Sequence, residues 1–309
     1  MDFGPIFAGV KPVVSAADLG ICHLETPVSA PNGPYVGWPR FSAPPQVLTG
    51  VRETGFDDCS TASNHSYDDG VAGVDRTVNA LDRAGLHHSG TAETARQAAT
   101  PNVFTMHGVT VAELSYTFGL NSGLSLPADK PWLVNVTEVD KVLAAAHSAR
   151  EAGAQIVVLS LHWGTEYQEA PTALQVSQAR ALLASPDVDL ILGCHVHVVQ
   201  PFEKINGKWV VYGMGNEIAR HEDPIDASRE GVMPRVTFTE VAPGHWKATA
   251  VQAIPTWVDI SPKIRLVDLA GALASSNLDA ATRTTYRTAY DRIVTAVRSR
   301  GATVGVPVS

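Results

Sequence analysis

Two histidines lie two residues apart at the end of a short apolar run, in the segment Gly193-Cys194-His195-Val196-His197. Directly after a buried strand and a glycine turn, both imidazoles can face one cleft. Neutral imidazole is the commonest nitrogen ligand for first-row metal ions. The pair therefore predicts metal ligands, and exposed loop histidines are the alternative.

A third histidine, His162, comes directly after the apolar run IVVLSL at residues 156–161. A β-branched run without polar alternation is typical of a strand buried on both faces. At the carboxyl end of such a strand, His162 is a candidate metal ligand, and a core histidine bonded to the backbone is the alternative. Glu166 follows and is a candidate substrate-binding residue at the rim.

Two further polar clusters follow predicted strands. Asn64 offers a metal an amide oxygen, and the adjacent His65 can act as a general acid; a helix N-cap is the alternative for Asn64. Glu25 can bridge two cations, and its alternative is a surface residue before a turn. For each cluster alone the structural alternative is preferred. Together, four clusters at four strand ends favour one site, because open α/β sheets bind ligands there.

Other polar residues have weaker claims. Arg40 lies in a Pro-rich loop at residues 31–45, and Arg220 and His221 follow Gly215-Asn216-Glu217. All three are candidates for substrate binding, with packed surface loops as the alternative. Asp68 and Asp69 are expected to favour the start of the next helix through its dipole.

These clusters need an alternating framework to position them. Apolar runs bounded by glycine, proline or asparagine alternate with amphipathic stretches, which predicts α/β layering. Helices are predicted at residues 73–84, 139–152, 172–183 and 279–298. Strands are predicted at residues 18–24, 57–62, 109–116, 156–161, 190–192, 209–212, 232–241 and 245–258.

Composition limits the classes of function. Of 309 residues, 45% are hydrophobic and 17% charged, which favours a folded core over disorder. The net charge of −8 disfavours nucleic-acid binding through a basic field. The sequence has no apolar run of the ~20 residues that span a bilayer. It also lacks a signal-peptide pattern, so a cytoplasmic location is expected, or an anchored or exported one if a segment precedes Met1.

Three cysteines, Cys22, Cys59 and Cys194, are odd in number and lack CxxC spacing. The pattern indicates neither a disulfide framework nor a zinc knuckle. We expect them to be small buried apolar residues.

Several ordered segments carry a family resemblance that runs from about Phe3 to Glu217. The chain resembles the bacterial capsule-synthesis CapA family, which is associated with poly-gamma-glutamate and belongs to the metallophosphoesterase-like superfamily. The segments are SAADLGICHLETP, ASNHSYDDG, LSLHWGTEY, GCHVHVVQP and VVYGMGNE. The resemblance implies a calcineurin-like metallophosphoesterase fold, a four-layer α/β/β/α sandwich, over residues 1–260. A helical extension at 261–309 is expected to pack on it.

The resemblance also implies a site for two divalent ions, with manganese, zinc or iron as candidates. It assigns Glu25 as the bridging acid and His65 as the catalytic acid/base. It assigns Asn64, His162 and His195 to the second metal and His197 to the first.

The chain departs from the family pattern in two places. Position 23 is histidine where the acid motif usually reads Asn-Leu-Glu. The Gly-Asp strand whose aspartate binds the first metal has no counterpart, since Asp2 is not on a predicted strand. The fold is therefore expected to lack its first strand.

Three functions follow from this resemblance. The first is a metal-dependent hydrolase of phosphate esters or related bonds, linked to capsule or poly-gamma-glutamate synthesis. The second is a metal-dependent peptide epimerase that moves a Cα proton. The third is a non-catalytic factor that binds a polymer during assembly. The substrate would be a small molecule, a peptide or a polymer.

Overall fold

The computed structural model describes residues 1–219 and 226–308. The chain forms two compact units. The first comprises Met1–Gly4, Val13–His162 and Ser185–Val188, and the second comprises Pro5–Pro12, Trp163–Ala184 and Asp189–Ser309. The division at residue 260 expected from the sequence stays a prediction.

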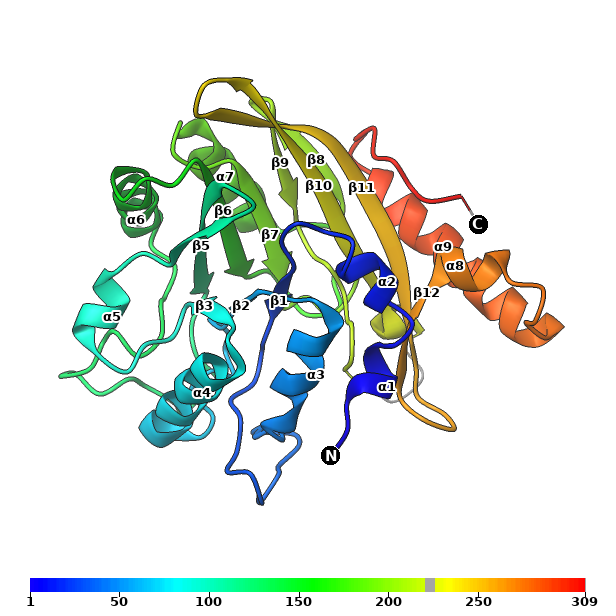
Figure 1. Ribbon diagram of the computed structural model, residues 1–309, viewed down its shortest axis with the longest axis horizontal. Helices are drawn as coiled ribbons and strands as arrows, with labels where there is room; N and C mark the ends of the chain where they lie inside the picture. Colours follow the sequence, from blue (N-terminus) through cyan, green and yellow to red (C-terminus); the bar gives the residue numbers. More distant parts are fainter. Residues whose placement is uncertain (220–225, 309) are drawn as a thin grey trace. The chain divides into compact units, whose positions relative to one another are not determined.

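The first unit contains two groups of strands (Figure 1). One is a parallel three-stranded sheet in the order β1-β2-β3, formed by Ile21–His23, Asp58–Ser60 and His87–Ser89. In the other, β5 pairs antiparallel with β4 and parallel with β6; the three strands are Val103–Met106 (β4), Val109–Thr117 (β5) and Ile156–His162 (β6). The α/β class predicted from the sequence is confirmed, and the four-layer arrangement stays a prediction.

Helices connect the parallel strands of this unit, as such crossovers require. They are α3 (Gln46–Thr54), α4 (Gly70–Ala84) and α6 (Val139–Glu151), while the short α5 (Ala95–Ala99) lies between β3 and β4 of different sheets. Helix α4 ends at Gly85, whose φ of 69° gives the left-handed C-cap that glycine adopts readily. Val74 and Val78 of α4 pack with Ala62, Leu133 and Val134 in a buried cluster. Ala62 directly precedes Ser63-Asn64-His65 in the sequence, so this buried cluster anchors that segment.

A disulfide joins Cys22 of β1 to Cys59 of β2, which corrects the expectation that the cysteines are unlinked apolar residues. The two residues are register partners in adjacent parallel strands, with Cα atoms 4.4 Å apart. Because the two cysteines are 37 residues apart in the chain, the sequence alone does not show that they are adjacent. Cys194 is buried, as expected.

The second unit combines strands and helices. Strand β7 (Leu190–Cys194) pairs parallel with β9 (Lys208–Val211), and β8 (Phe202–Ile205) pairs antiparallel with β9. Asn206 and Gly207 join β8 to β9 with φ angles of 53° and 80°, the left-handed conformations that a two-residue hairpin turn requires.

A long antiparallel ribbon, β10 (Glu230–Ala242) and β11 (His245–Asp259), adds β12 (Arg265–Asp268) at its edge. A short 3₁₀ turn, Asp226–Arg229, precedes it. Figure 1 shows α8 (Leu269–Ala274) and α9 (Ala280–Arg298) against this ribbon, and α7 (Ala173–Ala184) follows the loop after His162.

Two four-residue helices, α1 (Gly4–Phe7) and α2 (Lys11–Val14), precede β1. The first strand of the described chain is therefore β1, and Asp2 accepts a hydrogen bond from the Gly4 amide instead of ending a strand. Among the described residues, no helix is both long enough and apolar enough to cross a bilayer.

Candidate metal centre

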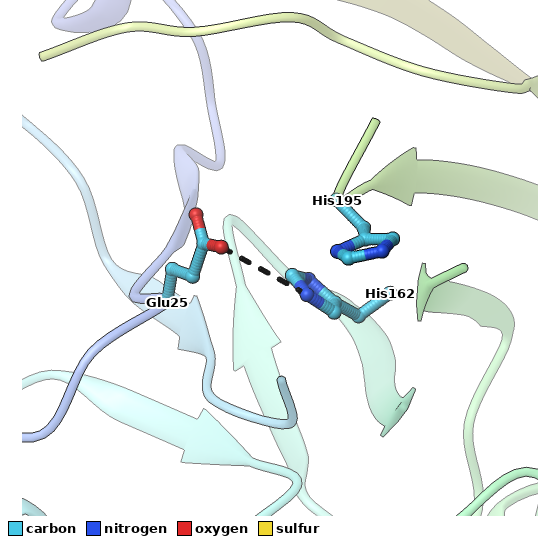
Figure 2. A group of neighbouring side chains, drawn as sticks. All are labelled: Glu25, His162 and His195. Carbon is cyan, nitrogen blue, oxygen red and sulfur yellow. Dashed lines mark ion pairs between the residues drawn. The ribbon is translucent and has the colours of Figure 1, made fainter. Parts of the chain in front are cut away.

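Three of the predicted ligands converge in the first unit. The carboxylate of Glu25 lies 3.9 Å from Nε2 of His162, and the Oδ1 atom of Asn64 lies 2.6 Å from the same nitrogen. Figure 2 shows the Glu25–His162 pair of the first unit. Parallel pairing of β1 with β2 brings their carboxyl ends to one edge of the sheet. This explains why Glu25 and Asn64, which follow these strands, both lie near His162.

His162 ends β6 with its side chain fully buried. Its Nδ1 atom lies 3.0 Å from Nε2 of His23, and the two rings stack with centroids 5.1 Å apart. The aromatic ring of Phe118 is nearly parallel to the imidazole of His162, at a centroid distance of 6.3 Å. The His162 ring is therefore held by His23 and Phe118, with Nε2 toward Glu25 and Asn64.

Asn64 is oriented by Asn121, which sequence reasoning missed. The Asn64 Nδ2 group donates to Asn121 Oδ1 at 2.6 Å, and the Asn121 backbone amide donates to the Asn64 carbonyl at 3.2 Å. Because its amide nitrogen is engaged, Asn64 presents Oδ1 to His162. Asn121 lies 57 residues along the chain in a loop after β5, so no local motif marks it.

His65 forms a close pair with Asp68, also missed as a functional residue. Its Nδ1 atom lies 2.6 Å from Asp68 Oδ2, and their side chains are 13% and 0% exposed. The Asp68 carboxylate also accepts from the Phe41 amide at 2.9 Å and from Asn121 Nδ2 at 3.2 Å. Asn121 Nδ2 also lies 2.9 Å from His65 Nδ1, but both groups donate to Asp68, so we assign no hydrogen bond between them.

Asp68 thus has a different role from the one its position before a helix suggested. Helix α4 begins at Gly70 with Asp69 as its N-cap, and no side chain caps it. The carboxylate of Asp68 accepts hydrogen bonds from three groups instead. The sequence signal for this pair was that Asp68 follows His65 by three residues. A turn over these residues brings the two side chains together.

In the second unit, His195 and His197 follow β7 in unusual backbone conformations. Their φ angles are 88° and 57°, in the left-handed region that costs a non-glycine residue about 1–3 kcal/mol. Their ring centroids are 6.3 Å apart. In β7, just before this turn, glycine at position 193 allows the Tyr212 backbone to pack closely, because a Cβ atom there would lie 2.0 Å from the Tyr212 carbonyl oxygen. Strain of this kind is common at functional sites.

His197 has its own supporting amide. Its Nδ1 atom lies 2.9 Å from Asn216 Oδ1, while Asn216 Nδ2 donates to the Ser228 carbonyl at 2.7 Å. The second bond fixes which end of the Asn216 amide faces the imidazole. His197 therefore donates from Nδ1, which leaves Nε2 as its ligand nitrogen.

The predicted rim residues differ in their surroundings. Arg40 is exposed in the first unit, next to Phe41, whose ring packs edge-on against His65 with centroids 4.7 Å apart. Glu166 is exposed in the second unit, next to Tyr167, whose ring stacks on His197 at 5.8 Å. Arg220 and His221 lie outside the described residues.

The donors of the first unit fit a divalent ion. Glu25 offers a carboxylate oxygen, Asn64 an amide oxygen and His162 an imidazole nitrogen, a mixed set that zinc, manganese and iron accept. The His162 side chain has no exposed surface and the Glu25 side chain is 25% exposed, so the set combines a buried imidazole with a partly exposed acid.

The solved structures to which the chain is similar are distant in sequence. The calcineurin-like phosphoesterase YfkN from Bacillus subtilis is 17% identical with a TM-score of 0.44, covering 82% of this chain and 75% of that one. The NAD nucleotidase of Haemophilus influenzae is 12% identical with a TM-score of 0.43, covering 84% of this chain and 49% of that one.

Curated relatives are closer in sequence. The capsule biosynthesis protein CapA of Bacillus anthracis is 29% identical over 57% of this chain and 43% of its own length. The PGA biosynthesis protein CapA of Bacillus subtilis is 27% identical over 68% of this chain and 56% of its own. A probable polyglutamine synthesis accessory protein of Mycobacterium tuberculosis is 28% identical over 67% and 57%. The chain thus spans about half the length of these relatives.

The family model described as bacterial capsule synthesis protein PGA_cap matches residues 1–221. This match includes every predicted ligand and the His65–Asp68 pair. The chain therefore belongs to the bacterial capsule synthesis protein family.

Proposed function

We propose that the protein is a metal-dependent hydrolase of phosphate esters or related bonds. The observation that carries this proposal is the pairing of His65 with Asp68 next to Asn64, a residue whose amide oxygen meets His162. A proton-transfer group thus adjoins a candidate metal ligand in the chain. Proton transfer and charge neutralisation are the two requirements of ester hydrolysis.

The proposed ligand set is the one that the sequence predicted. Glu25 would bridge two divalent ions, Asn64, His162 and His195 would hold one of them, and His197 the other. A bound divalent ion would supply Lewis-acid activation of water and neutralise charge that develops on the ester. The ligand set is supported by the Glu25–His162–Asn64 geometry and by the strained histidines after β7.

His65 would donate the proton to the leaving group. With Nδ1 engaged by Asp68, proton transfer falls to Nε2, and the carboxylate stabilises the imidazolium when the ring is charged. Asp68 is fully buried, which strengthens this interaction relative to water. Phe41 limits the movement of the ring through its edge-on contact.

The substrate would come from the synthesis of a surface polymer. Two relatives carry names that refer to PGA biosynthesis and polyglutamine synthesis. A small molecule, a peptide or the polymer itself would fit this setting. Arg40 and Glu166 are proposed to contact the substrate, because both are exposed beside aromatic rings that pack on His65 and His197.

A hydrolysis screen with metal loading tests this function. The purified chain is titrated with Mn²⁺, Zn²⁺ and Fe²⁺, and the loaded protein is given phosphomono- and diesters, carboxylic esters and γ-glutamyl peptides. We expect hydrolysis that requires metal and that falls at least ~100-fold in His65→Gln, the loss typical of a missing general acid. A matched control is His147→Gln, an exposed histidine of α6.

Other outcomes assign other functions. Deuterium uptake at a peptide Cα without bond cleavage would replace hydrolysis by epimerisation. Bound metal with neither reaction, together with polymer binding that survives His162→Ala, would favour the non-catalytic assembly factor.

A further inference from the structure

We propose that His23 is a positioning residue that holds His162 in the orientation a metal requires. This inference rests on the proposed role of His162 as a ligand. Position 23 is the place where the chain departs from the asparagine usual in the family motif, and no part of the proposed mechanism uses it. Its side chain nevertheless makes two directed contacts.

His23 bridges a hydroxyl and a ligand imidazole. Its Nδ1 atom lies 2.9 Å from Ser60 Oγ, and its Nε2 atom lies 3.0 Å from His162 Nδ1. Ser60 is the register partner of His23 in the β1–β2 pair, and its hydroxyl also lies 3.3 Å from the Cys22 carbonyl oxygen. Both ring nitrogens of His23 therefore have a partner, one on β2 and one at the end of β6.

One direction of hydrogen bonding suits metal binding. His162 can coordinate through Nε2 only if its proton lies on Nδ1, which then donates to His23 Nε2. His23 in turn carries its proton on Nδ1 and donates it to Ser60 Oγ, and Ser60 donates to the Cys22 carbonyl. Each donor in this series of hydrogen bonds has a matching acceptor. His23 thus selects the His162 tautomer that leaves Nε2 as a ligand.

The opposite direction suits the protein without metal. There His162 Nε2 donates to Asn64 Oδ1, His23 Nε2 donates to His162 Nδ1, and Ser60 donates to His23 Nδ1. Both imidazoles are neutral in both directions, so the two arrangements differ only in where the protons sit. The relay allows His162 to change tautomer while the His162–His23 and His23–Ser60 hydrogen bonds are both kept.

Two substitutions separate the contacts of His23. Glutamine places its terminal amide near the position of imidazole Nε2, so His23→Gln keeps a partner for His162. Asparagine places its amide near Nδ1, so His23→Asn keeps the Ser60 contact alone. Because partners of metal-bound histidines typically change affinity 10- to 100-fold, we expect Mn²⁺ or Zn²⁺ to bind about 10- to 100-fold more weakly to His23→Asn. His23→Gln should stay within about threefold of wild type.

Calorimetric titration with each ion measures these affinities, and ¹⁵N NMR of labelled histidines reports the His162 tautomer. We expect a shift of the proton to Nδ1 on loading of wild type and of His23→Gln. His88→Asn is the matched control, because His88 is also a part-buried histidine of this sheet but bonds to Asp82. Thermal unfolding without metal shows whether each variant folds.

The outcomes separate this inference from the proposed function. Wild-type protein that binds neither ion overturns the metal site itself. Tight binding by both wild type and a folded His23→Asn overturns the role of His23 alone. Equal losses in His23→Asn and His23→Gln would also contradict it, because a space-filling role would not distinguish the two contacts.

Discussion

Three imidazoles of the candidate centre each have a partner that fixes one ring nitrogen. His65 contacts Asp68, His162 contacts His23, and His197 contacts Asn216. Each partner meets Nδ1, so each ring has Nε2 for chemistry. The aspartate beside His65 stabilises a charged imidazolium, which suits proton transfer, whereas the partners of His162 and His197 are uncharged.

The Asp68 carboxylate is expected to matter for turnover and less for metal binding. In Asp68→Asn the amide cannot stabilise the imidazolium of His65, and it can reverse the ring tautomer. We expect kcat to fall about 10²- to 10⁴-fold, the range for a lost acid/base function. Metal affinity, measured by calorimetry, should change less than about threefold.

The neighbouring acid provides the control for that variant. Asp69 pairs with Arg76 and with Ser42, outside the His65 contacts. Asp69→Asn should therefore retain the wild-type kcat. A similar loss in both variants would mean that the segment before α4 was disturbed, and that Asp68 has no particular role.

The sequence indicated the imidazoles but not their partners. His65, His162 and His197 stood out because each follows a predicted strand. Asn121 lies in a loop with no local signal, 56 residues from His65, and Asn216 lies in the segment VVYGMGNE, 19 residues from His197, without an expected role. Such contacts depend on how loops return to the sheet edge, and single-sequence patterns do not encode that return.

At the scale of elements, strand and helix positions followed the predicted pattern closely. The buried strand predicted at 156–161 is β6, Ile156–His162, and the helix predicted at 139–152 is α6, Val139–Glu151. Long apolar or amphipathic runs carry enough periodicity to be read. The short strands β1 and β2 were predicted longer than their three residues. Their pairing, and hence the disulfide, is a tertiary property.

The Cys22–Cys59 disulfide is expected to stabilise the pair of strands that leads to Glu25 and Asn64. It closes a loop of 37 residues, which in the chain-entropy account contributes about 3–4 kcal/mol to the free energy of unfolding. Urea unfolding of wild type should shift to lower urea when dithiothreitol is added. The Cys22→Ala, Cys59→Ala variant should resemble the reduced protein and show no response to reductant. A wild type that ignores full reduction would contradict this contribution.

Helix α9 is attached to the ribbon by an ion pair. Arg292 Nε donates to Glu230 Oε1 at 2.7 Å, and burial of Glu230 raises its pKa to about 7 against the opposing effect of Arg292. Arg292→Gln should lower the free energy of unfolding by about 1–3 kcal/mol, because a buried carboxylate loses charged donors. Arg287→Gln, an exposed change on the same helix, should stay within about 0.5 kcal/mol. Equal urea midpoints for the two variants would argue against this attachment.

For the molecule as a whole, the net charge opposes long-range attraction of anions. A net charge of −8 repels an anionic polymer at a distance, so recognition of such a substrate would depend on local groups such as Arg40. The composition therefore predicted the absence of a basic field, but it does not predict which local cations act. Two buried acids, Asp58 and Glu113, are expected to affect stability.

Asp58 and Glu113 are both fully buried in the first unit. Burial raises the pKa of Asp58 from 3.8 to about 7, although Asn102 donates to its carboxyl group at 2.9 Å. Burial, followed by the charge of Asp58, raises the pKa of Glu113 well above its usual 4.5. The folded protein therefore retains protons that the unfolded chain releases at lower pH.

The sign of the pH dependence follows from these shifts. The stability that the protonated Asp58 contributes is complete below pH 3.8 and is lost as the pH rises toward about 7. Between pH 5 and 6 we expect the free energy of unfolding to fall by about 1.4 kcal/mol per pH unit for this group. Urea midpoints measured across this range should fall in wild type, and the fall should be shallower in Asp58→Asn, whose side chain is neutral throughout. Asp82→Asn, an exposed acid of α4, should keep the wild-type slope, and a matching slope in Asp58→Asn would remove the buried acid as the cause.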